Sequence, residues 1–395
     1  MDKKNIYKII PFLLIAVFFI VNCVHVSFVK DLVITAYEWI VGLDKNAPIE
    51  ELATKNQRLY SHLMDINSQM LNLTGVKMVD KGGTVFVRMK NDAIYNEPET
   101  VSQDEIDKCA DWIYELKLYS EGKGADFLYV FAPSKAYDVS LYPANTTNLY
   151  DDFSQRFINA LSERQITYID LLDSLLKEGY THDEVFYKTD HHWRAEIGLW
   201  TADKIIQALG ELYSFPYESE KYNPHNYNFE IYEDWFLGWN GKKCGRYFNG
   251  GEVDDFVLIS PKYETSFSVE TRNDIPDRNG RFEEVMFYYD NLTKDFYKKD
   301  AYFVYTGANH NLQLITNNLV ENNKKILIVR DSFGCVVSPF LAISSKQTAI
   351  VELRHFALGP RIDLIEYIDE FQPDYVVLLF NEIPVALLDY KLNLK

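Results

Sequence analysis

Cysteine and positive charge are both scarce in this chain. The four cysteines, Cys23, Cys109, Cys244 and Cys335, include no CxxC pair, which argues against a zinc knuckle. Cys23 lies in an apolar segment, and the other three are an odd number, so they imply no disulfide framework and allow at most one bridge. Asp and Glu number 58 against 40 Lys and Arg, a formal net charge of −18. A nucleic-acid-binding protein needs basic surface to displace counterions from phosphate, so we expect no nucleic-acid partner.

Apolar and aromatic residues, by contrast, are plentiful. Hydrophobic residues make up 47% of the chain and aromatic residues 15%, so the sequence can bury a core and does not have the composition of a disordered protein. Its 395 residues are enough for more than one domain.

The N-terminus combines positive charge with a long apolar run. Lys3, Lys4 and Lys8 precede an apolar segment over residues 9–29, and about twenty apolar residues span a bilayer. The lysines place the N-terminal side in the cytoplasm. Residues 1–30 are therefore predicted to be a cytoplasmic tip and a transmembrane helix, which makes this a single-pass protein of the cell membrane with the rest of the chain extracytoplasmic.

Two other interpretations of this segment remain open. A cleaved signal peptide usually has a shorter apolar region and small residues at its cleavage site, whereas this run ends without an A-x-A pattern. A lipoprotein site at Cys23 would need a small residue just before it, and Asn22 stands there. Both alternatives also place the remaining chain outside the cytoplasm.

Residues 31–76 are predicted to form a stalk or a packing helix. Apolar residues recur over 47–72 at spacings of mostly three, four and seven, which is typical of a helix. A coiled-coil contact and a helix packed on the globular body explain this pattern equally well.

From about residue 77, segments typical of strands alternate with segments typical of helices. The expected strands are 84–89, 126–133, 166–171, 324–329, 348–353 and 375–380. The expected helices are 102–121, 150–164, 193–212, 330–345 and 361–371. Such alternation predicts a mostly parallel sheet covered on both faces, in one domain over 77–395. Residues from about 213 to 320 are rich in Tyr, Asn, Asp and Gly, and are predicted to be an irregular, β-leaning insertion.

One strand runs directly into a candidate nucleophile. The buried strand 325–329 is followed by Arg330, Asp331 and Ser332 and then by a helix. Catalytic groups of open α/β sheets gather at the carboxyl ends of strands. A serine at the start of a helix has its own backbone N–H free to bind an oxyanion, and the helix dipole favours negative charge there. An N-cap role for Ser332 explains the same local pattern equally well.

The stretch KTDHHWRAE, residues 188–196, supplies a base and an acid for that serine. Asp190 and His192 are two apart, so in an extended segment their side chains lie on the same side. His192 is then the base and Asp190 the group that orients it, while His191 points the opposite way. Exchanged roles for the two histidines and a purely structural role for the stretch are the alternatives.

A metal site is the alternative to this triad. His182 and Asp183 lie near the same stretch, but adjacent histidines do not easily face one ion, and the spacing differs from the helical HExxH pattern. We therefore expect neither a metal nor a cofactor.

The order of these motifs resembles a known family. Asp190-His191-His192-Trp193 followed far downstream by Asp331-Ser332 is similar to the DHHW proteins and to the alginate O-acetyltransferase accessory proteins of the AlgX and AlgJ type. These proteins have an SGNH-hydrolase-like fold with the Asp-x-His element before the serine, whereas ordinary GDSL hydrolases have the reverse order. The segments 131–143, 351–356 and 373–382 resemble further parts of the family, so the likeness extends over roughly 77–390. It implies a three-layer α/β fold with a mostly parallel sheet.

The sequence also departs from the SGNH pattern. Arg330 stands where GDSL proteins have glycine, and the separate glycine and asparagine blocks that complete an oxyanion hole are not evident. Asn381 and Arg354, both at predicted strand ends, are candidates for oxyanion or substrate binding, and His191 is a further one. Lys135 is either a substrate-binding residue or half of a buried ion pair.

The resemblance implies O-acetyl transfer onto an extracytoplasmic polysaccharide. Family members act with a membrane-bound O-acyltransferase that exports the acetyl group, so we expect such a partner, a polysaccharide acceptor and one membrane helix. A carbohydrate acetyl esterase with the same triad is the first alternative. A non-catalytic glycan-binding or assembly protein is the second.

Overall fold

The computed structural model describes residues 57–96, 101–144, 153–272, 275–354 and 357–381. The predicted membrane anchor, residues 1–30, and the first part of the predicted stalk lie outside these ranges. Within them, no helix combines the length and the apolar character needed to cross a membrane.

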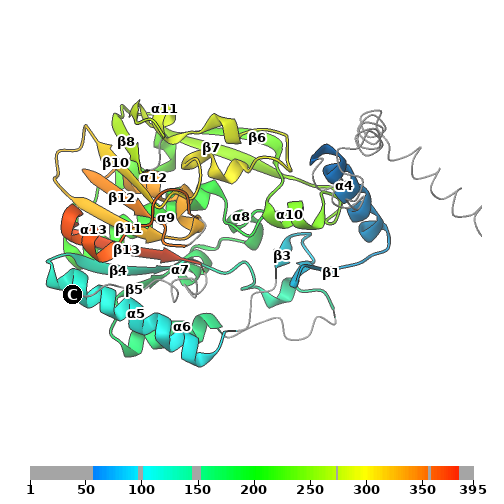
Figure 1. Ribbon diagram of the computed structural model, residues 1–395, viewed down its shortest axis with the longest axis horizontal. Coiled ribbons are helices and arrows are strands. Elements are labelled where there is room, and N and C mark those ends of the chain that lie inside the picture. Colours follow the sequence, from blue (N-terminus) through cyan, green and yellow to red (C-terminus); the bar gives the residue numbers. More distant parts are fainter. Residues whose placement is uncertain (1–56, 97–100, 145–152, 273–274, 355–356, 382–395) are drawn as a thin grey trace, which may run out of the picture.

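An eight-stranded sheet forms the centre of the molecule (Figure 1). Its strands, in spatial order, are β5 Tyr168–Asp170, β4 Asp126–Phe131, β13 Tyr375–Phe380, β11 Lys325–Arg330, β12 Gln347–Val351, β10 Leu312–Asn317, β8 Phe267–Thr271 and β9 Arg278–Gly280. The first five strands in this order are parallel, and the last three are antiparallel to their neighbours. The sheet is therefore mostly parallel, as predicted.

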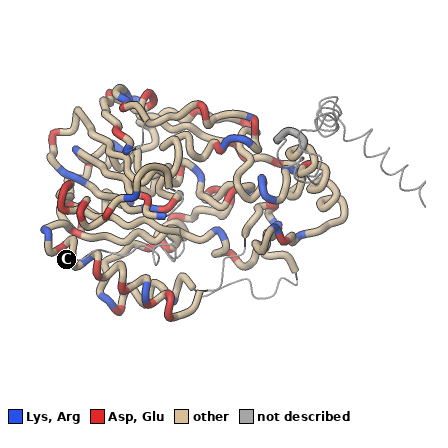
Figure 2. Tube along the Cα trace, viewed as in Figure 1, with Lys and Arg blue, Asp and Glu red and all other residues tan. Residues whose placement is uncertain are grey.

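Helices cover both faces of the sheet, which makes three layers. Alternate residues of β4 show why: Phe127 and Tyr129 pack in one core with α5, α6 and α13, while Leu128 and Val130 pack in a second core with α7, α9 and α12. Buried parallel strands are apolar on both sides for this reason. Figure 2 shows few charged residues on these strands and both signs along the outer helices α5 and α6. The helix bounds are α5 Gln103–Gly122, α6 Phe153–Glu163, α7 Leu171–Glu178, α9 Ala195–Tyr213, α12 Ser338–Leu341 and α13 Leu364–Phe371.

Two local features fix where these helices lie. The Ser102 side chain accepts a hydrogen bond from the Glu105 backbone N–H, and the Glu105 side chain accepts one from the Ser102 N–H, so a capping box starts α5. Gly198 lets α9 approach the turn after β11, since a Cβ there would lie 2.5 Å from the carbonyl oxygen of Val336. The predicted strands and helices between 84 and 212 and between 324 and 380 are present with ends that differ by a few residues, except for the helix expected over 330–345. That segment forms the 3₁₀ helix η6 Ser332–Val336 followed by the four-residue helix α12.

The region 213–320 is less separate from the sheet than the sequence suggested. Strands β8, β9 and β10 come from it and extend the central sheet as antiparallel neighbours. The rest forms an antiparallel pair, β6 Tyr227–Phe236 with β7 Asp254–Pro261, and the helices α10 Trp239–Cys244 and α11 Phe282–Met286. The strands of this region pair with one another and with the central sheet, and this pairing satisfies their backbone N–H and C=O groups.

A small N-terminal unit packs beside this body. It consists of α4 Gln57–Leu73 and an antiparallel sheet of β1 Met78–Lys81, β2 Thr84–Arg88 and β3 Ile94–Asn96. The Tyr297 hydroxyl donates to Asp65 of α4 at 2.5 Å, and the Ser68 hydroxyl accepts from the Tyr247 N–H at 3.1 Å. The remaining short elements are α8 His182–Val185, η1 Val139–Leu141, η2 Ser219–Tyr222, η3 Pro224–Asn226, η4 Tyr289–Asn291, η5 Ala301–Tyr305 and η6 Ser332–Val336.

No disulfide bond stabilises the described part of the fold. Cys109, Cys244 and Cys335 are buried and free, and Cys23 lies outside the described residues. Burial raises the pKa of both the Cys109 and the Cys244 thiol to about 12, so neither is a reactive thiolate at neutral pH.

Candidate active site

Ser332 lies at the carboxyl end of β11, the fourth of the eight strands in spatial order. Asp331 caps the short helix η6 by accepting the Phe333 N–H at 2.9 Å with Oδ1. Its other oxygen, Oδ2, accepts the Asn381 N–H at 2.9 Å at the end of β13. The cap is therefore Asp331, and Ser332 is the first residue of the helix, with its side chain free for other contacts.

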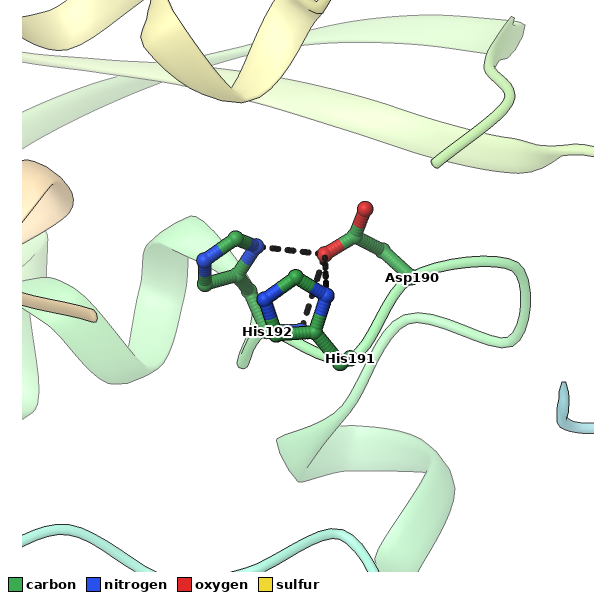
Figure 3. A group of neighbouring side chains, drawn as sticks. All are labelled: Asp190, His191 and His192. Atoms are coloured by element: carbon green, nitrogen blue, oxygen red, sulfur yellow. Dashed lines mark hydrogen bonds and ion pairs between the residues drawn. The ribbon is translucent and has the colours of Figure 1, made fainter. Parts of the chain in front are cut away.

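The hydroxyl of Ser332 meets the base predicted from the sequence. Its Oγ lies 2.8 Å from Nε2 of His192, and Nδ1 of His192 lies 2.5 Å from Oδ1 of Asp190. Figure 3 shows the ring of His192 directed at the Asp190 carboxylate. The fold thus brings together three side chains from segments that are 140 residues apart in the sequence. The arrangement can take a proton from the serine and stabilise the charge that forms on the imidazole.

The Asp190 carboxylate is buried and fully engaged. Oδ1 also accepts the His192 backbone N–H at 2.9 Å, and Oδ2 accepts the Trp239 backbone N–H at 2.5 Å. Burial alone would raise the pKa of Asp190, but the neighbouring imidazoles and these hydrogen bonds outweigh it and hold the pKa well below its usual value. Asp190 is therefore a carboxylate at neutral pH, as a group that orients a histidine must be.

Aromatic rings fix the His192 imidazole in place. Tyr302 stacks on it with centroids 3.9 Å apart and planes 10° from parallel, and Phe333 lies at 5.0 Å. The Tyr302 hydroxyl and the Trp193 Nε1–H both donate to the carbonyl oxygen of Phe333, at 3.3 and 3.0 Å. Tyr302 could not be identified from the sequence, because one tyrosine among 28 in the chain carries no local signal.

His191 does not lie where the alternation argument placed it. Residues 188–192 form a bend rather than an extended strand. Adjacent side chains can therefore lie on the same side of this loop. The His191 ring lies 3.8 Å from the His192 ring, and its Nδ1 is 3.6 Å from Oδ1 of Asp190 (Figure 3). Burial and the charge of His192 lower the pKa of His191 to about 3. A neutral imidazole therefore stands beside the base, with a third of its side chain exposed.

The same bend brings three possible metal ligands together. Ligand atoms of Asp190, His191 and His192 all lie within 4.8 Å of one another, so the expectation that adjacent histidines face apart does not hold here. Asp190 and His192 already have hydrogen-bond partners, since the two ring nitrogens of His192 contact Ser332 and Asp190. A cation bound here would have to displace those hydrogen bonds, so the donor set fits the acid–base arrangement better than a metal.

Lys135 neither faces a substrate site nor forms the buried ion pair considered from the sequence; it holds backbone groups of the protein. Lys135 is 2% exposed, and no carboxylate among the described residues lies in ion-pair distance of its ammonium. The ammonium donates to four carbonyl oxygens: those of Ile94, Tyr187, Lys188 and Asp190, at 2.8, 2.6, 3.1 and 2.6 Å. Three of these acceptors belong to the loop that carries the base. Burial lowers the pKa of Lys135 to about 8.

Asp254 holds the same loop from another direction. Its Oδ1 accepts the Lys188 N–H at 2.6 Å, and its Oδ2 accepts the Thr189 N–H at 2.8 Å and the Thr189 hydroxyl at 2.5 Å. These bonds occupy both oxygens of a buried carboxylate on β7. The loop 187–190 is therefore fixed by side chains from outside it.

Arg354 and Asn381, the candidates at strand ends, contact other groups of the protein. Arg354 forms a two-point contact with buried Glu352, at 2.9 Å from Nε and 2.5 Å from Nη2, and Arg330 lies 3.6 Å from the same carboxylate. The Asn381 side chain donates to the carbonyl of Pro133, and its backbone N–H supports Asp331. The buried Arg330, in the place of the GDSL glycine, also donates to Asn309 at 2.5 Å. The role of Arg354 and Asn381 in oxyanion or substrate binding stays a prediction.

Comparisons with known proteins identify the family and the fold. Residues 95–230 match the family model described as an SGNH hydrolase-like domain, acetyltransferase AlgX, which confirms the resemblance found from the motifs. The match includes Asp190 and His192 and ends before Ser332. No curated protein sequence matches the chain.

Solved structures show the fold over most of the chain. PatB1 of Bacillus cereus, solved with a sulfonyl adduct, superposes with a TM-score of 0.62 and 19% identity, over 78% of this chain and 96% of that one. A DHHW family protein from Eubacterium siraeum superposes with a TM-score of 0.58 and 18% identity, over 81% and 99%. The α/β fold is therefore the SGNH-like fold that the resemblance implied.

Proposed function

We propose that this protein is an O-acetyltransferase that modifies an extracytoplasmic polysaccharide through a serine ester. One observation carries the proposal: Ser332, His192 and Asp190 form a hydrogen-bonded series at the carboxyl end of β11. The match to an acetyltransferase family model adds support.

The reaction has two steps that use the same groups. In the first, Ser332 Oγ attacks the acetyl carbonyl of the donor, its proton passes to Nε2 of His192, and the leaving group departs with that proton. In the second, a sugar hydroxyl gives its proton to His192 and attacks the acetyl-serine. The proton returns to Ser332 Oγ as the new ester leaves. Asp190 stabilises the imidazolium in both steps, and neither step needs a cofactor.

Each step passes through a tetrahedral oxyanion, which needs hydrogen-bond donors. The backbone N–H of Ser332 is the first of η6, and no acceptor for it is found among the described residues. It is our first candidate donor. Arg354 and Asn381 remain proposed contributors, as predicted from the sequence.

The setting of the reaction is also a proposal. Residues 1–30 would anchor the chain with its N-terminus in the cytoplasm, so that the catalytic domain faces outward. A membrane-bound O-acyltransferase would deliver the acetyl group, and a nearby polysaccharide would accept it. Support comes from the lysines and apolar run at the N-terminus and from what the family resemblance implies.

The decisive experiment uses the full-length chain, purified in detergent, with p-nitrophenyl acetate as donor. We expect release of nitrophenol, an acetyl group on Ser332 by mass spectrometry, and acetylated sugar when a glycan acceptor is added. The control is Ser332→Ala, which should do none of these. Release of acetate with no transfer to any glycan would favour the esterase alternative. Absence of an acetyl-serine and of turnover would contradict the enzyme proposal and favour a non-catalytic glycan-binding protein.

A further inference from the structure

Trp239 occupies a special place at the edge of the site. It begins α10, and its backbone N–H donates to Oδ2 of Asp190 at 2.5 Å. Its side chain is turned outward and is 36% exposed. The residue before it must be glycine, since a Cβ on Gly238 would overlap with the Asp190 side chain. The same residue therefore supports the acid of the triad and presents an indole to solvent.

The indole is linked to the reacting atoms by ring contacts. Trp239 meets His191 edge to face, with centroids 5.8 Å apart and planes at 81°. His191 in turn lies against His192, which reaches Ser332. The indole therefore lies next to the ring that flanks the base of the triad.

The rest of the environment keeps the indole in one orientation. Phe86 packs on it at 5.5 Å, and the Lys243 ammonium lies 5.3 Å from its centroid. No hydrogen-bond partner for the indole Nε1–H is found among the described residues. Trp193 is the internal contrast: it is fully buried, and its Nε1–H donates to Phe333. Trp193 has the contacts of a packing residue, whereas Trp239 is partly exposed, and the only group over its ring besides Phe86 and His191 in the described residues is the flexible Lys243 side chain.

We infer that Trp239 is the platform for the acceptor glycan, and that a sugar ring stacks on its indole while one hydroxyl of that sugar reaches His192. This inference rests on the proposed function. A pyranose suits this surface because it has a face of C–H groups, which packs on an aromatic ring, and a rim of hydroxyls, which takes hydrogen bonds. Binding sites of this kind combine aromatic walls with a few polar groups. Here the polar groups are the indole N–H and the neutral His191.

In this arrangement the acceptor completes the second step of the reaction. The hydroxyl oxygen forms a bond to the acetyl carbon, its proton goes to His192 Nε2, and the bond from that carbon to Ser332 Oγ breaks. The proton then returns to Ser332. The stacked ring keeps the hydroxyl near the acetyl-serine in place of water.

Binding measured without any donor tests the inference directly. The probes are three oligosaccharides of five sugars each: a neutral glucan, a chitin fragment and a uronate. Isothermal titration with the full-length chain should show binding of at least one. Trp239→Ala and Trp239→Leu should weaken that binding about tenfold, because both keep the backbone N–H but lose the flat ring. Trp239→Phe should weaken it less, and Tyr289→Ala, which removes another exposed aromatic side chain, on η4, should bind like the unaltered protein.

Kinetics separate a lost platform from a damaged triad. With the bound oligosaccharide as acceptor, Trp239→Leu should lower transfer about tenfold more than it lowers hydrolysis of p-nitrophenyl acetate, through a higher KM for the acceptor. Equal losses in both reactions would overturn the inference, as would binding by Trp239→Leu that matches the unaltered protein, or no binding of any probe. A chain that binds an oligosaccharide through Trp239 but hydrolyses no ester would instead contradict the proposed function alone.

Discussion

The two segments that meet in the site are held in different ways. Ser332 follows a buried strand and begins a helix whose cap is its own neighbour, Asp331. The loop with Asp190 and His192 has no regular structure and is fixed by contacts from distant parts of the chain. The serine is therefore placed by local secondary structure. The base is oriented by its neighbour Asp190, but the loop that carries both is held by residues distant in sequence, such as Lys135 and Asp254, so changes far from the loop should disturb it.

The largest effect should come from breaking the contact where the two segments meet. Ser332→Ala removes the nucleophile and His192→Ala removes its base, so each should lower kcat by a factor on the order of 10⁶ if the triad acts as one unit. The double variant should then be little worse than either single one. Hydrolysis of p-nitrophenyl acetate measures this. Losses that multiply in the double variant would show that the two residues act independently.

Asp190→Asn should have the next largest effect. The variant keeps the size of the side chain but favours the wrong tautomer of His192, which costs a factor on the order of 10⁴ in kcat in a comparable triad. The measurement is the same ester assay, with circular dichroism to verify folding. Full activity in Asp190→Asn would mean that His192 does not depend on this carboxylate.

The segment with Ser332 could be predicted from the sequence more completely than the loop with Asp190 and His192, because the serine is placed by local structure and the loop by distant contacts. The strand, the turn and Ser332 could be predicted because apolar runs and turn residues are local signals. The pairing of Asp190 with His192 was predicted, but for an extended segment, and the bend that brings His191 alongside was not. Lys135 was noticed but given the wrong partners, since its carbonyl acceptors are invisible in a sequence. Tyr302 and Trp239 were missed, because only the folded chain brings them to the loop.

Lys135→Met tests how far the loop depends on distant support. The change removes a buried donor from four carbonyl oxygens, so we expect a loss of about 3 kcal/mol in the free energy of unfolding together with a fall in kcat. Urea unfolding and the ester assay measure the two effects. Lys177→Met, on an exposed lysine, should change stability by less than about 0.5 kcal/mol. Equal stabilities for the two variants would mean that Lys135 contributes nothing to the loop.

Substitution of Tyr302 should lower kcat less, through the position of the His192 imidazole. Tyr302→Leu removes a stacked ring, a contact worth about 0.5–1.5 kcal/mol, so kcat should fall up to about tenfold. Tyr302→Phe keeps the ring and loses only the hydrogen bond to Phe333, so it should retain most activity. If Phe is as harmful as Leu, the hydroxyl rather than the stacking positions His192.

The smallest effect should be seen in the pH dependence of stability, through His191. Its pKa is lowered from 6.5 to about 3 in the folded chain, mainly by burial. Between these values the unfolded chain binds a proton that the folded chain does not, so folding loses stability as the pH falls from about 6.5 to about 3. Because a third of the side chain is exposed, solvent should moderate the loss.

His191→Gln removes the titrating group and should therefore reduce that loss. The comparison is the urea midpoint at pH 7 and at pH 5 for the unaltered chain, His191→Gln and His225→Gln, the last at an exposed histidine outside the site. We expect the midpoint of His191→Gln to fall least between the two pH values, with His225→Gln like the unaltered chain. If His191→Gln shifts as much as the unaltered chain, His191 is solvated enough to take up its proton in the folded state. The loop would then be more open to water than the serine turn it meets.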